Sequence, residues 1–184
     1  MKVCVFGASS DSIPSGYLTA ARRLGEELAS RGHTLYYGGG AHGVMGEAAR
    51  GTLSKGGKIV GVAPSFFDVG DTLIHDGELM LTETMRERKA MLEEASDASA
   101  VLPGGIGTYE EFFEVLVLCQ LDRLRKPIAV YNVDGCYDKL GELILDTVKH
   151  GFMQQPCLKL CRFCRKADEI FDYFAEFYAM PLIP

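Results

Sequence analysis

The 184-residue sequence lacks the apolar runs, the basic charge and the leader pattern that mark several common protein classes. No apolar stretch approaches the roughly 18–20 residues that a membrane span needs, so we expect no membrane partner. The formal net charge is −6, whereas a general nucleic-acid binder presents a basic surface, so we expect no nucleic-acid partner. After Met1, a short apolar run gives way at once to Gly7 and polar residues, which is not the layout of a signal peptide; the expected location is the cytoplasm.

Cysteine is present, but not in a pattern that predicts a metal site. Cys161 and Cys164 form a C-x-x-C with Cys157 nearby. A structural zinc site usually shows two such pairs, and the nearby candidate for a fourth ligand is His150. We therefore interpret these cysteines as packing residues in a strand that leads to the last helix, and we expect no metal.

The composition is that of a globular domain. With 47% hydrophobic and 24% charged residues and no repeat or low-complexity linker, residues 1–184 fit a single domain. Short apolar and β-branched runs predict strands, and segments of helical periodicity alternate with them. The expected strands are 2–6, 34–37, 58–62, 98–102 and 128–131, and the expected helices are 17–31, 43–53, 84–94, 108–121, 137–150 and 167–178. Residues 65–82 are the least regular stretch and are expected to form a loop over the site.

This alternation predicts a parallel sheet with helices on both faces, a doubly wound, Rossmann-like α/β fold. In such folds, ligands bind at the carboxyl ends of the strands, where the strand order reverses. The glycine-rich turns of this sequence all follow predicted strands. We therefore expect a small-molecule site at that edge of the sheet.

The strongest functional signal is the stretch Val-Leu-Pro-Gly-Gly-Ile-Gly-Thr-Tyr-Glu-Glu at positions 101–111. A predicted strand leads into a glycine-rich turn, and an apolar helix follows directly. The amides of Gly105, Gly107 and Thr108 then lie unshielded at a helix N-terminus, where the helix dipole favours an anion. Glu111 lies one turn into the helix. Alone, it is equally well explained as an acid that stabilises the dipole, but the turn before it favours chemistry on a phosphorylated small molecule.

A second glycine cluster, at positions 38–43, matches the G-x-G-x-x-G of dinucleotide-binding folds. Such a site also needs an acidic residue about 20 positions further on to hold the ribose. Here the next strand ends Gly-Val-Ala-Pro, and the cluster belongs to the second strand–helix pair rather than the first. A mononucleotide ligand fits better than NAD, and no cofactor is expected.

Three motifs together resemble the LONELY GUY family of cytokinin-activating phosphoribohydrolases, which are often labelled lysine decarboxylases. The family's P-G-G-x-G-T-x-x-E is present at 103–111, its G-G-G-x-x-G-L-M-G at 38–46, and its M-H-x-R-K at 85–89, with Arg86 in place of histidine. The resemblance runs from residue 3 to about residue 152. It implies hydrolysis of the N-glycosidic bond of adenosine-type nucleoside 5′-monophosphates, N6-prenylated or not, to free base and ribose 5-phosphate.

The resemblance implies that Arg88 and Glu111 are the catalytic pair. Cleavage builds positive charge on the sugar, and Glu111 either stabilises that charge or orients the attacking water through the ribose hydroxyls. Arg88 has a planar fork suited to phosphate, although charge runs such as the one around it are usually solvated helix faces. Met85, taken alone, is more typical of core. The candidate substrate-binding residues are Ser9, Gly40, Gly43, Met85, Lys89, Gly104, Gly105, Ile106, Gly107 and Thr108.

The serious alternative is a non-catalytic nucleotide-binding or carrier protein, since the same turns can hold a nucleotide without cleaving it. A lysine decarboxylase would need pyridoxal phosphate and a Schiff-base lysine, for which the sequence shows no arrangement. A third alternative is a structural oligomer, because the predicted helix is apolar almost all round at 112–121. The resemblance implies a homodimer. None of the four histidines has a partner in the sequence pattern that suggests acid–base catalysis.

Overall fold

The computed structural model describes residues 1–67 and 77–180. Its strands are β1 (Lys2–Phe6), β2 (Thr34–Tyr37), β3 (Lys58–Pro64), β4 (Glu78–Thr82), β5 (Ala98–Val101), β6 (Ile128–Tyr131) and β7 (Cys161–Cys164). Its α-helices are α1 (Ser15–Ser30), α2 (Gly43–Ser54), α3 (Met85–Ala95), α4 (Ile106–Gln120), α5 (Asp138–Lys149) and α6 (Ala167–Ala179). Short 3-10 turns occur at Val133–Gly135 and Gln155–Lys159.

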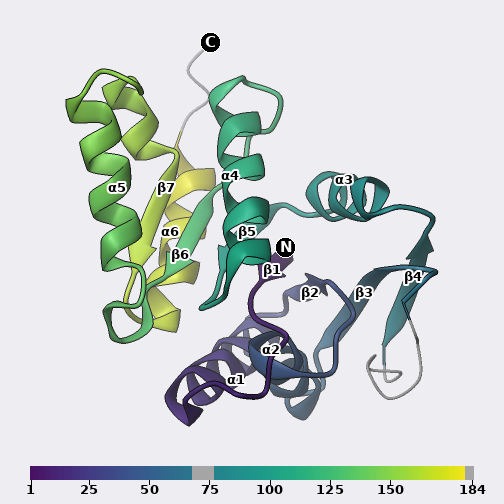
Figure 1. Cartoon of the computed structure of the whole chain (residues 1–184). Helices are drawn as coiled ribbons and strands as arrows, with labels where there is room; N and C mark the ends of the chain where they lie inside the picture. The colour runs from purple at the N-terminus through teal and green to yellow at the C-terminus, as the bar shows by residue number, and fades with distance from the viewer. Residues whose placement is uncertain (68–76, 181–184) are drawn as a thin grey trace.

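The strands form one seven-stranded sheet in the order β4-β3-β2-β1-β5-β6-β7 (Figure 1). Every pairing is parallel, for example Val3 beside Leu35 of β2 on one side and Ala98 of β5 on the other. The order reverses between β1 and β5, which makes the carboxyl ends of these two strands the switch point of the fold. The predicted doubly wound, Rossmann-like α/β class is confirmed.

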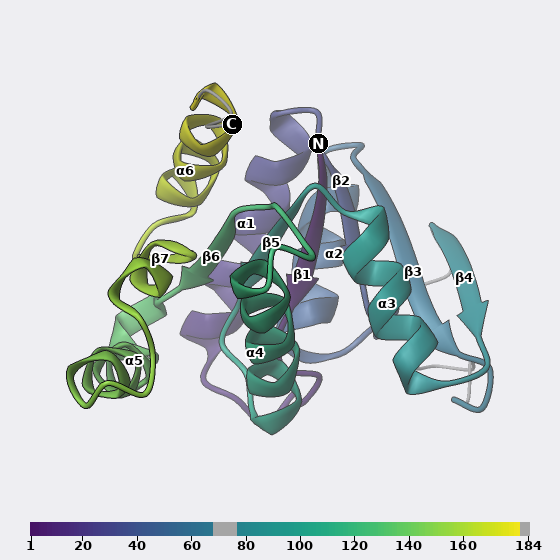
Figure 2. The ribbon, with the colours of Figure 1, turned by 90° about the horizontal axis from the view of Figure 1, so that it is seen from above.

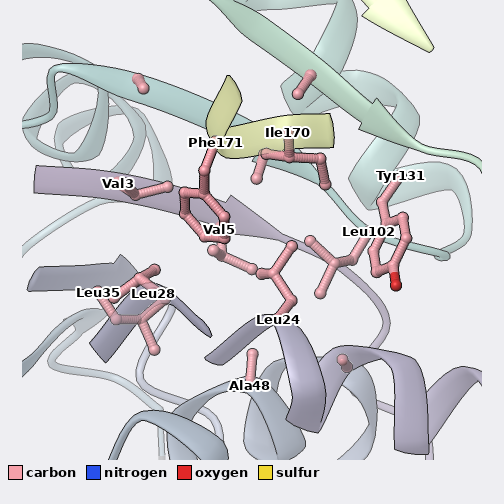
Figure 3. Packing of buried hydrophobic residues seen from close by; sticks show 14 of the residues in the cluster. Val3, Val5, Leu24, Leu28, Leu35, Ala48, Leu102, Tyr131, Ile170 and Phe171 are labelled. Carbon is pink, nitrogen blue, oxygen red and sulfur yellow. The ribbon is translucent and has the colours of Figure 1, made fainter. Parts of the chain in front are cut away.

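Helices cover both faces of the sheet (Figure 2). On one face, α1, α2 and α6 bury an apolar core that is seen from close by in Figure 3; its labelled members are Val3, Val5, Leu24, Leu28, Leu35, Ala48, Leu102, Tyr131, Ile170 and Phe171. On the other face, α3, α4 and α5 bury a second core that includes Phe6, Phe112 and Ile144. The central strands read as short continuous apolar runs because both of their faces are buried.

The predicted elements agree with the structure apart from small shifts at their ends and one missed strand. Helix α4 begins at Ile106, two residues before the predicted start, with Gly105 as its N-cap. The prediction of a loop over 65–82 is wrong in its last part, because Glu78–Thr82 forms the edge strand β4. The apolar run of this strand is only three residues long, Leu79 to Leu81, and Leu81 is exposed at the edge of the sheet, so the run is too short to predict a strand by itself. Residues 68–76 of the predicted loop, with His75, lie outside the described residues.

Two backbone hydrogen bonds join the loops at the switch point. The Leu102 amide donates to the Phe6 carbonyl at 2.8 Å, and the Ala8 amide donates to the Pro103 carbonyl at 3.1 Å. The turn after β1 and the glycine-rich turn after β5 are therefore held side by side. Over the described part of the chain, no helix has the length and apolar character of a membrane span.

Candidate active site

A cavity of about 350 Å³ opens at the carboxyl ends of β1 and β5. Its wall is formed by the turn after β1, the first turns of α4, one residue of α2 and one of α3: Gly7, Ala8, Ser9, Ser10, Met45, Arg88, Gly105, Gly107, Thr108 and Glu111. A larger cavity, of about 560 Å³, lies at the other end of α4 beside Cys119 and Phe152. Its wall has one carboxylate, Asp122, and no cation. The smaller cavity has a cation and a carboxylate, Arg88 and Glu111, beside the main-chain amides at the start of α4.

The amino end of α4 is open for an anion. Gly105 is the N-cap, and no side chain among the described residues caps this helix. The first amides of an α-helix have no partner within the helix, and they carry the positive end of its dipole. Thr108, in the first turn, is buried against the same cavity. This arrangement suits a phosphate group.

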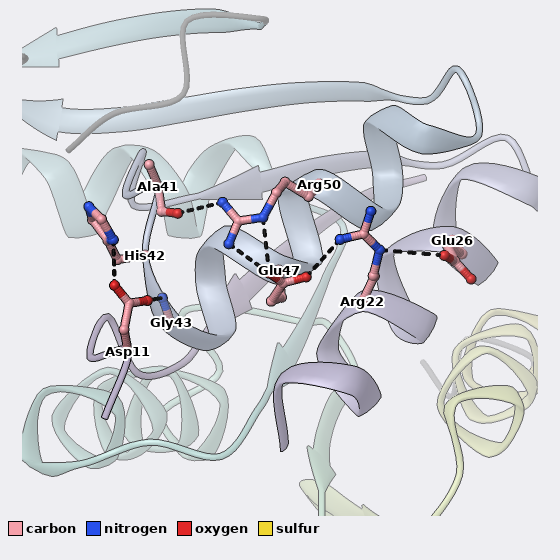
Figure 4. A network of polar contacts seen from close by, with 8 residues as sticks. All are labelled: Asp11, Arg22, Glu26, Ala41, His42, Gly43, Glu47 and Arg50. Atoms are coloured by element: carbon pink, nitrogen blue, oxygen red, sulfur yellow. Dashed lines mark hydrogen bonds and ion pairs between the residues drawn. The ribbon is translucent and has the colours of Figure 1, made fainter. Parts of the chain in front are cut away.

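The amino end of α2, which follows the second glycine cluster, is instead occupied by the protein itself. Asp11 accepts a hydrogen bond from the Gly43 amide at 2.7 Å, and its other carboxylate oxygen lies 2.6 Å from His42 Nδ1 (Figure 4). These two hydrogen bonds hold the pKa of Asp11 below its ordinary value. The partner of His42 is 31 residues away in sequence, so no local pattern connects the two residues. The pair fastens the turn after β1 onto α2.

Arg88 and Glu111 form a buried ion pair at the cavity wall. Arg88 Nη1 donates to Glu111 Oε1 at 3.1 Å, and Arg88 Nε donates to the Val62 carbonyl at 3.2 Å. The two residues are only 7% and 8% exposed. Desolvation by burial raises the pKa of Glu111, and the charge and hydrogen bond of Arg88 offset part of that rise. Arg88 thus fixes one carboxylate oxygen of Glu111 at the wall of a cavity that also contains the candidate anion site at the start of α4.

The Arg88 guanidinium can occupy its position only because Gly38 has no side chain. A Cβ atom at this position would lie 2.1 Å from Arg88 Nη2, far inside van der Waals contact. Gly38 directly follows β2, and Val62 lies in β3, so the guanidinium rests on the carboxyl ends of these two strands. The glycine cluster at 38–43 therefore makes room for a catalytic candidate in addition to shaping a turn.

The structure brings part of the predicted site together. Ser9, Arg88, Gly105, Gly107, Thr108 and Glu111 line the cavity, whereas Gly40, Gly43, Met85, Lys89, Gly104 and Ile106 do not. Met85 is 40% exposed, so it is not the core residue that it resembles when taken alone. Ile106 is 86% exposed. Lys89 points to carboxylates on the outer side of α4 rather than to the cavity.

Sequence reasoning missed Gly7, Ala8, Ser10 and Met45 as wall residues. A signal for the first three was available, because they follow the first predicted strand, and the first strand of a doubly wound sheet lies at the switch point. Met45 belongs to the motif at 38–46, and its place in the wall depends on how α2 packs beside the turn after β1. Which of the glycine-rich turns meet depends on the strand order, which the sequence does not show.

The cysteine cluster behaves as packing residues. Cys161 and Cys164 are buried in β7, as predicted, and Cys157 is buried in the turn before it. Within residues 1–67 and 77–180, no group of three or more His, Cys, Asp or Glu side chains is placed to hold a metal ion.

The chain is similar to known proteins over most of its length. A family model described as "Possible lysine decarboxylase" matches residues 45–174. The chain is 38% identical over 184 residues to the probable cytokinin riboside 5′-monophosphate phosphoribohydrolase LOGL5 of Oryza sativa subsp. japonica, covering 98% of this chain and 74% of that protein. It is 36% identical over 180 residues to the cytokinin riboside 5′-monophosphate phosphoribohydrolase LOG3 of Arabidopsis thaliana, covering 96% and 82% respectively.

Among solved structures, the molybdenum cofactor carrier protein of Chlamydomonas reinhardtii has a TM-score of 0.74, with 97% of this chain and 98% of that chain covered. The two sequences are 21% identical. At this level of identity, the likeness shows the fold alone.

Proposed function

The chain belongs to the family of cytokinin riboside 5′-monophosphate phosphoribohydrolases, and from that premise we propose that it hydrolyses the N-glycosidic bond of adenosine-type nucleoside 5′-monophosphates, N6-prenylated ones included. The products are the free base and ribose 5-phosphate. The observation that carries the proposal is the buried Arg88–Glu111 pair, which shares one cavity with the uncapped amino end of α4.

The 5′-phosphate is proposed to bind at the amino end of α4. The amides of Gly105, Gly107 and Thr108 supply hydrogen-bond donors and the positive end of the helix dipole. The corresponding position on α2 already holds the carboxylate of Asp11, which leaves α4 as the better anion site. With the phosphate there, the ribose extends towards Glu111, one turn further along the same helix.

Glu111 is proposed to act on the ribose. In the reaction, water adds to C1′, the C1′–N bond breaks with its electron pair going to the base, and the base takes up a proton. Positive charge develops on the sugar ring as the bond breaks, and a fixed carboxylate stabilises this charge more than it stabilises the neutral nucleotide. The same carboxylate is also placed to orient the water through the ribose hydroxyls.

Arg88 supports Glu111 in this scheme. The guanidinium is already engaged by Glu111 and by the Val62 carbonyl, which favours an orienting and charge-balancing role over the phosphate-binding role that its planar fork suggests. Because burial alone raises the pKa of Glu111, the adjacent positive charge helps to keep the carboxylate ionised. No step of this scheme requires a metal or a cofactor.

We also propose that the protein acts as a homodimer. Exposed apolar side chains recur at helical spacing along α4, from its first residue to the residue after its end: Ile106, Phe113, Val117 and Leu121. Exposed apolar side chains gathered on one side of a helix often pack against another surface. Light scattering is expected to give twice the 20.1 kDa mass of the chain, and a mass of one chain would contradict the dimer. The cytoplasmic location stays a prediction.

The test is product release by the purified protein. AMP and N6-isopentenyladenosine 5′-monophosphate are incubated separately, and free base is separated from nucleotide by chromatography. Both substrates are used because Arg86 stands where the family motif has histidine, and the added charge can alter the preference for one of them. The Glu111→Gln variant is expected to lose at least about 100-fold in rate, by analogy with removal of other transition-state stabilising groups. Glu142→Gln, an exposed site on α5, is the matched control and is expected to retain activity. Nucleotide binding without cleavage by the unaltered protein would instead favour the carrier alternative.

A further inference from the structure

Helix α3 carries Arg88 but buries very little apolar surface. All of its residues, Met85–Ala95, are described, and its buried members are Arg88, Leu92 and Glu93. Leu92 is the one fully buried apolar side chain of this helix, and Met91 packs against the same core while partly exposed. A helix normally gains most of its stability by burying an apolar face, so polar contacts contribute a large part of what holds α3 in place.

Those polar contacts lie at both ends of α3 and on one side. At the amino end, the Thr84 side chain caps the helix by accepting a hydrogen bond from the Glu87 amide at 3.1 Å. At the carboxyl end, the buried ammonium group of Lys126 donates to the Ser96 carbonyl at 2.5 Å and to the Glu93 carbonyl. On the side that faces α4, Lys89 bridges two glutamates.

The side contact is a buried lysine between carboxylates. Lys89 Nζ forms ion pairs with Glu110 and with Glu114 Oε2, the latter at 2.5 Å. The Lys89 side chain is only 13% exposed, whereas the side chains of Glu110 and Glu114 are 54% and 37% exposed, so water reaches the carboxylates but little of the lysine. Glu93, one turn along α3, adds a third carboxylate whose charge acts on the same cluster.

The two ion pairs across the α3–α4 contact are adjacent in sequence. Arg88 pairs with Glu111 at the cavity wall, and Lys89 pairs with Glu110 next to it. A change in the distance between the two helices that lengthens the second pair must therefore also lengthen the first. Without the lysine, Glu110, Glu114 and Glu93 would repel one another across this contact.

We propose that Lys89 is a positioning residue, which clamps α3 to α4 and so fixes the geometry of the Arg88–Glu111 pair. This inference rests on the proposed function for its catalytic consequence, and it gives Lys89 a role other than substrate binding. Two observations support this role. Lys89 does not line the cavity, and its ammonium group is bound by the carboxylates of Glu110 and Glu114.

The catalytic test separates positioning from binding. Lys89→Met, which keeps the length of the side chain but removes its charge, is expected to lower kcat by about 10- to 100-fold with KM for AMP changed less than threefold, because misplacement of catalytic groups acts on the transition state. Lys89→Arg is expected to restore most of kcat. Lys139→Met, at an exposed position of α5, is the control and is expected to leave both constants unchanged. A raised KM with unchanged kcat, or no change at all in Lys89→Met, would overturn the proposal.

A second measurement does not depend on activity. The coupling free energy between Arg88→Met and Glu111→Gln is obtained from urea unfolding as a double-mutant cycle, once in the native background and once with Lys89→Met. The clamp predicts that the coupling falls to less than half in the Lys89→Met background, and equal coupling in both would refute it. If Lys89→Met does not fold, the same cycle is run with the double variant Glu110→Gln/Glu114→Gln. A chain that cleaves no nucleotide but shows the fall in coupling would sink the proposed function and leave the clamp standing.

Discussion

Replacing Gly38 with alanine should disable the site without changing any residue that contacts the cavity. The added Cβ would lie 2.1 Å from Arg88 Nη2, so the guanidinium must shift. We expect this shift to break the hydrogen bonds of Arg88 to Glu111 and to the Val62 carbonyl, which would leave a carboxylate buried without its partner. The backbone itself is not the obstacle, because Gly38 does not have a positive φ.

The magnitude follows from the contacts that are lost. Breaking a buried ion pair while one charge stays buried costs about 3–5 kcal/mol in the free energy of unfolding. For a domain of this size, that corresponds to a fall in Tm of roughly 6–20 °C, at about 2–4 °C per kcal/mol. Loss of the orienting contact to Glu111 is expected to lower kcat by at least about 100-fold.

The assay combines thermal unfolding with base release from AMP. Gly141→Ala is the matched control, because a Cβ at this helical position meets only Phe163, at 3.8 Å. It is expected to leave activity unchanged and to stabilise α5 by about 0.5–1 kcal/mol, since alanine favours a helix over glycine.

The decisive comparison is Gly38→Ala in an Arg88→Met background. If the clash with the guanidinium is the cause, the alanine should add little further destabilisation once that group is gone. An equal loss of stability in both backgrounds would show that Gly38 is needed for another reason, and the steric argument would be wrong.

Two further outcomes follow from buried polar groups. Burial, with the nearby charge of Glu114, raises the pKa of Glu93 to about 7, above its ordinary 4.5; the stability that this group contributes is therefore fully present below pH 4.5 and is lost as the pH rises through about 7. Glu93→Gln is expected to raise Tm at pH 8 while matching the unaltered protein at pH 4.5, and an equal shift at both pH values would contradict this. The buried Tyr137 hydroxyl donates to the Leu102 carbonyl at 2.7 Å, just before the glycine-rich turn. Tyr137→Phe is expected to lower the free energy of unfolding by about 1–3 kcal/mol in urea, and no loss would show that this carbonyl finds another donor.

The sequence predicts most strands and helices of this fold because the central strands are buried on both faces and are therefore mostly apolar. Strands β1, β5 and β6 are short apolar runs, and a helix follows each of them. The edge strand β4 is not predicted because its apolar run has only three residues and its sides are partly exposed. The motifs name Arg88 and Glu111, but their contact across 23 residues depends on how α3 and α4 lie on the sheet. The need for Gly38 beneath the guanidinium is likewise a property of that packing.

The two glycine-rich turns show why a motif alone does not locate an anion site. Both turns follow a strand and open a helix, so by sequence each is a candidate for the phosphate. In the structure, Asp11 binds the amino end of α2, the helix after the cluster at 38–43; no local pattern connects this residue of another loop with Gly43. The amino end of α4, which follows the turn at 103–105, has no such carboxylate among the described residues, and its amides face the cavity. A carboxylate supplied by the chain would compete with a substrate phosphate, so the site belongs to the helix that the protein leaves uncapped.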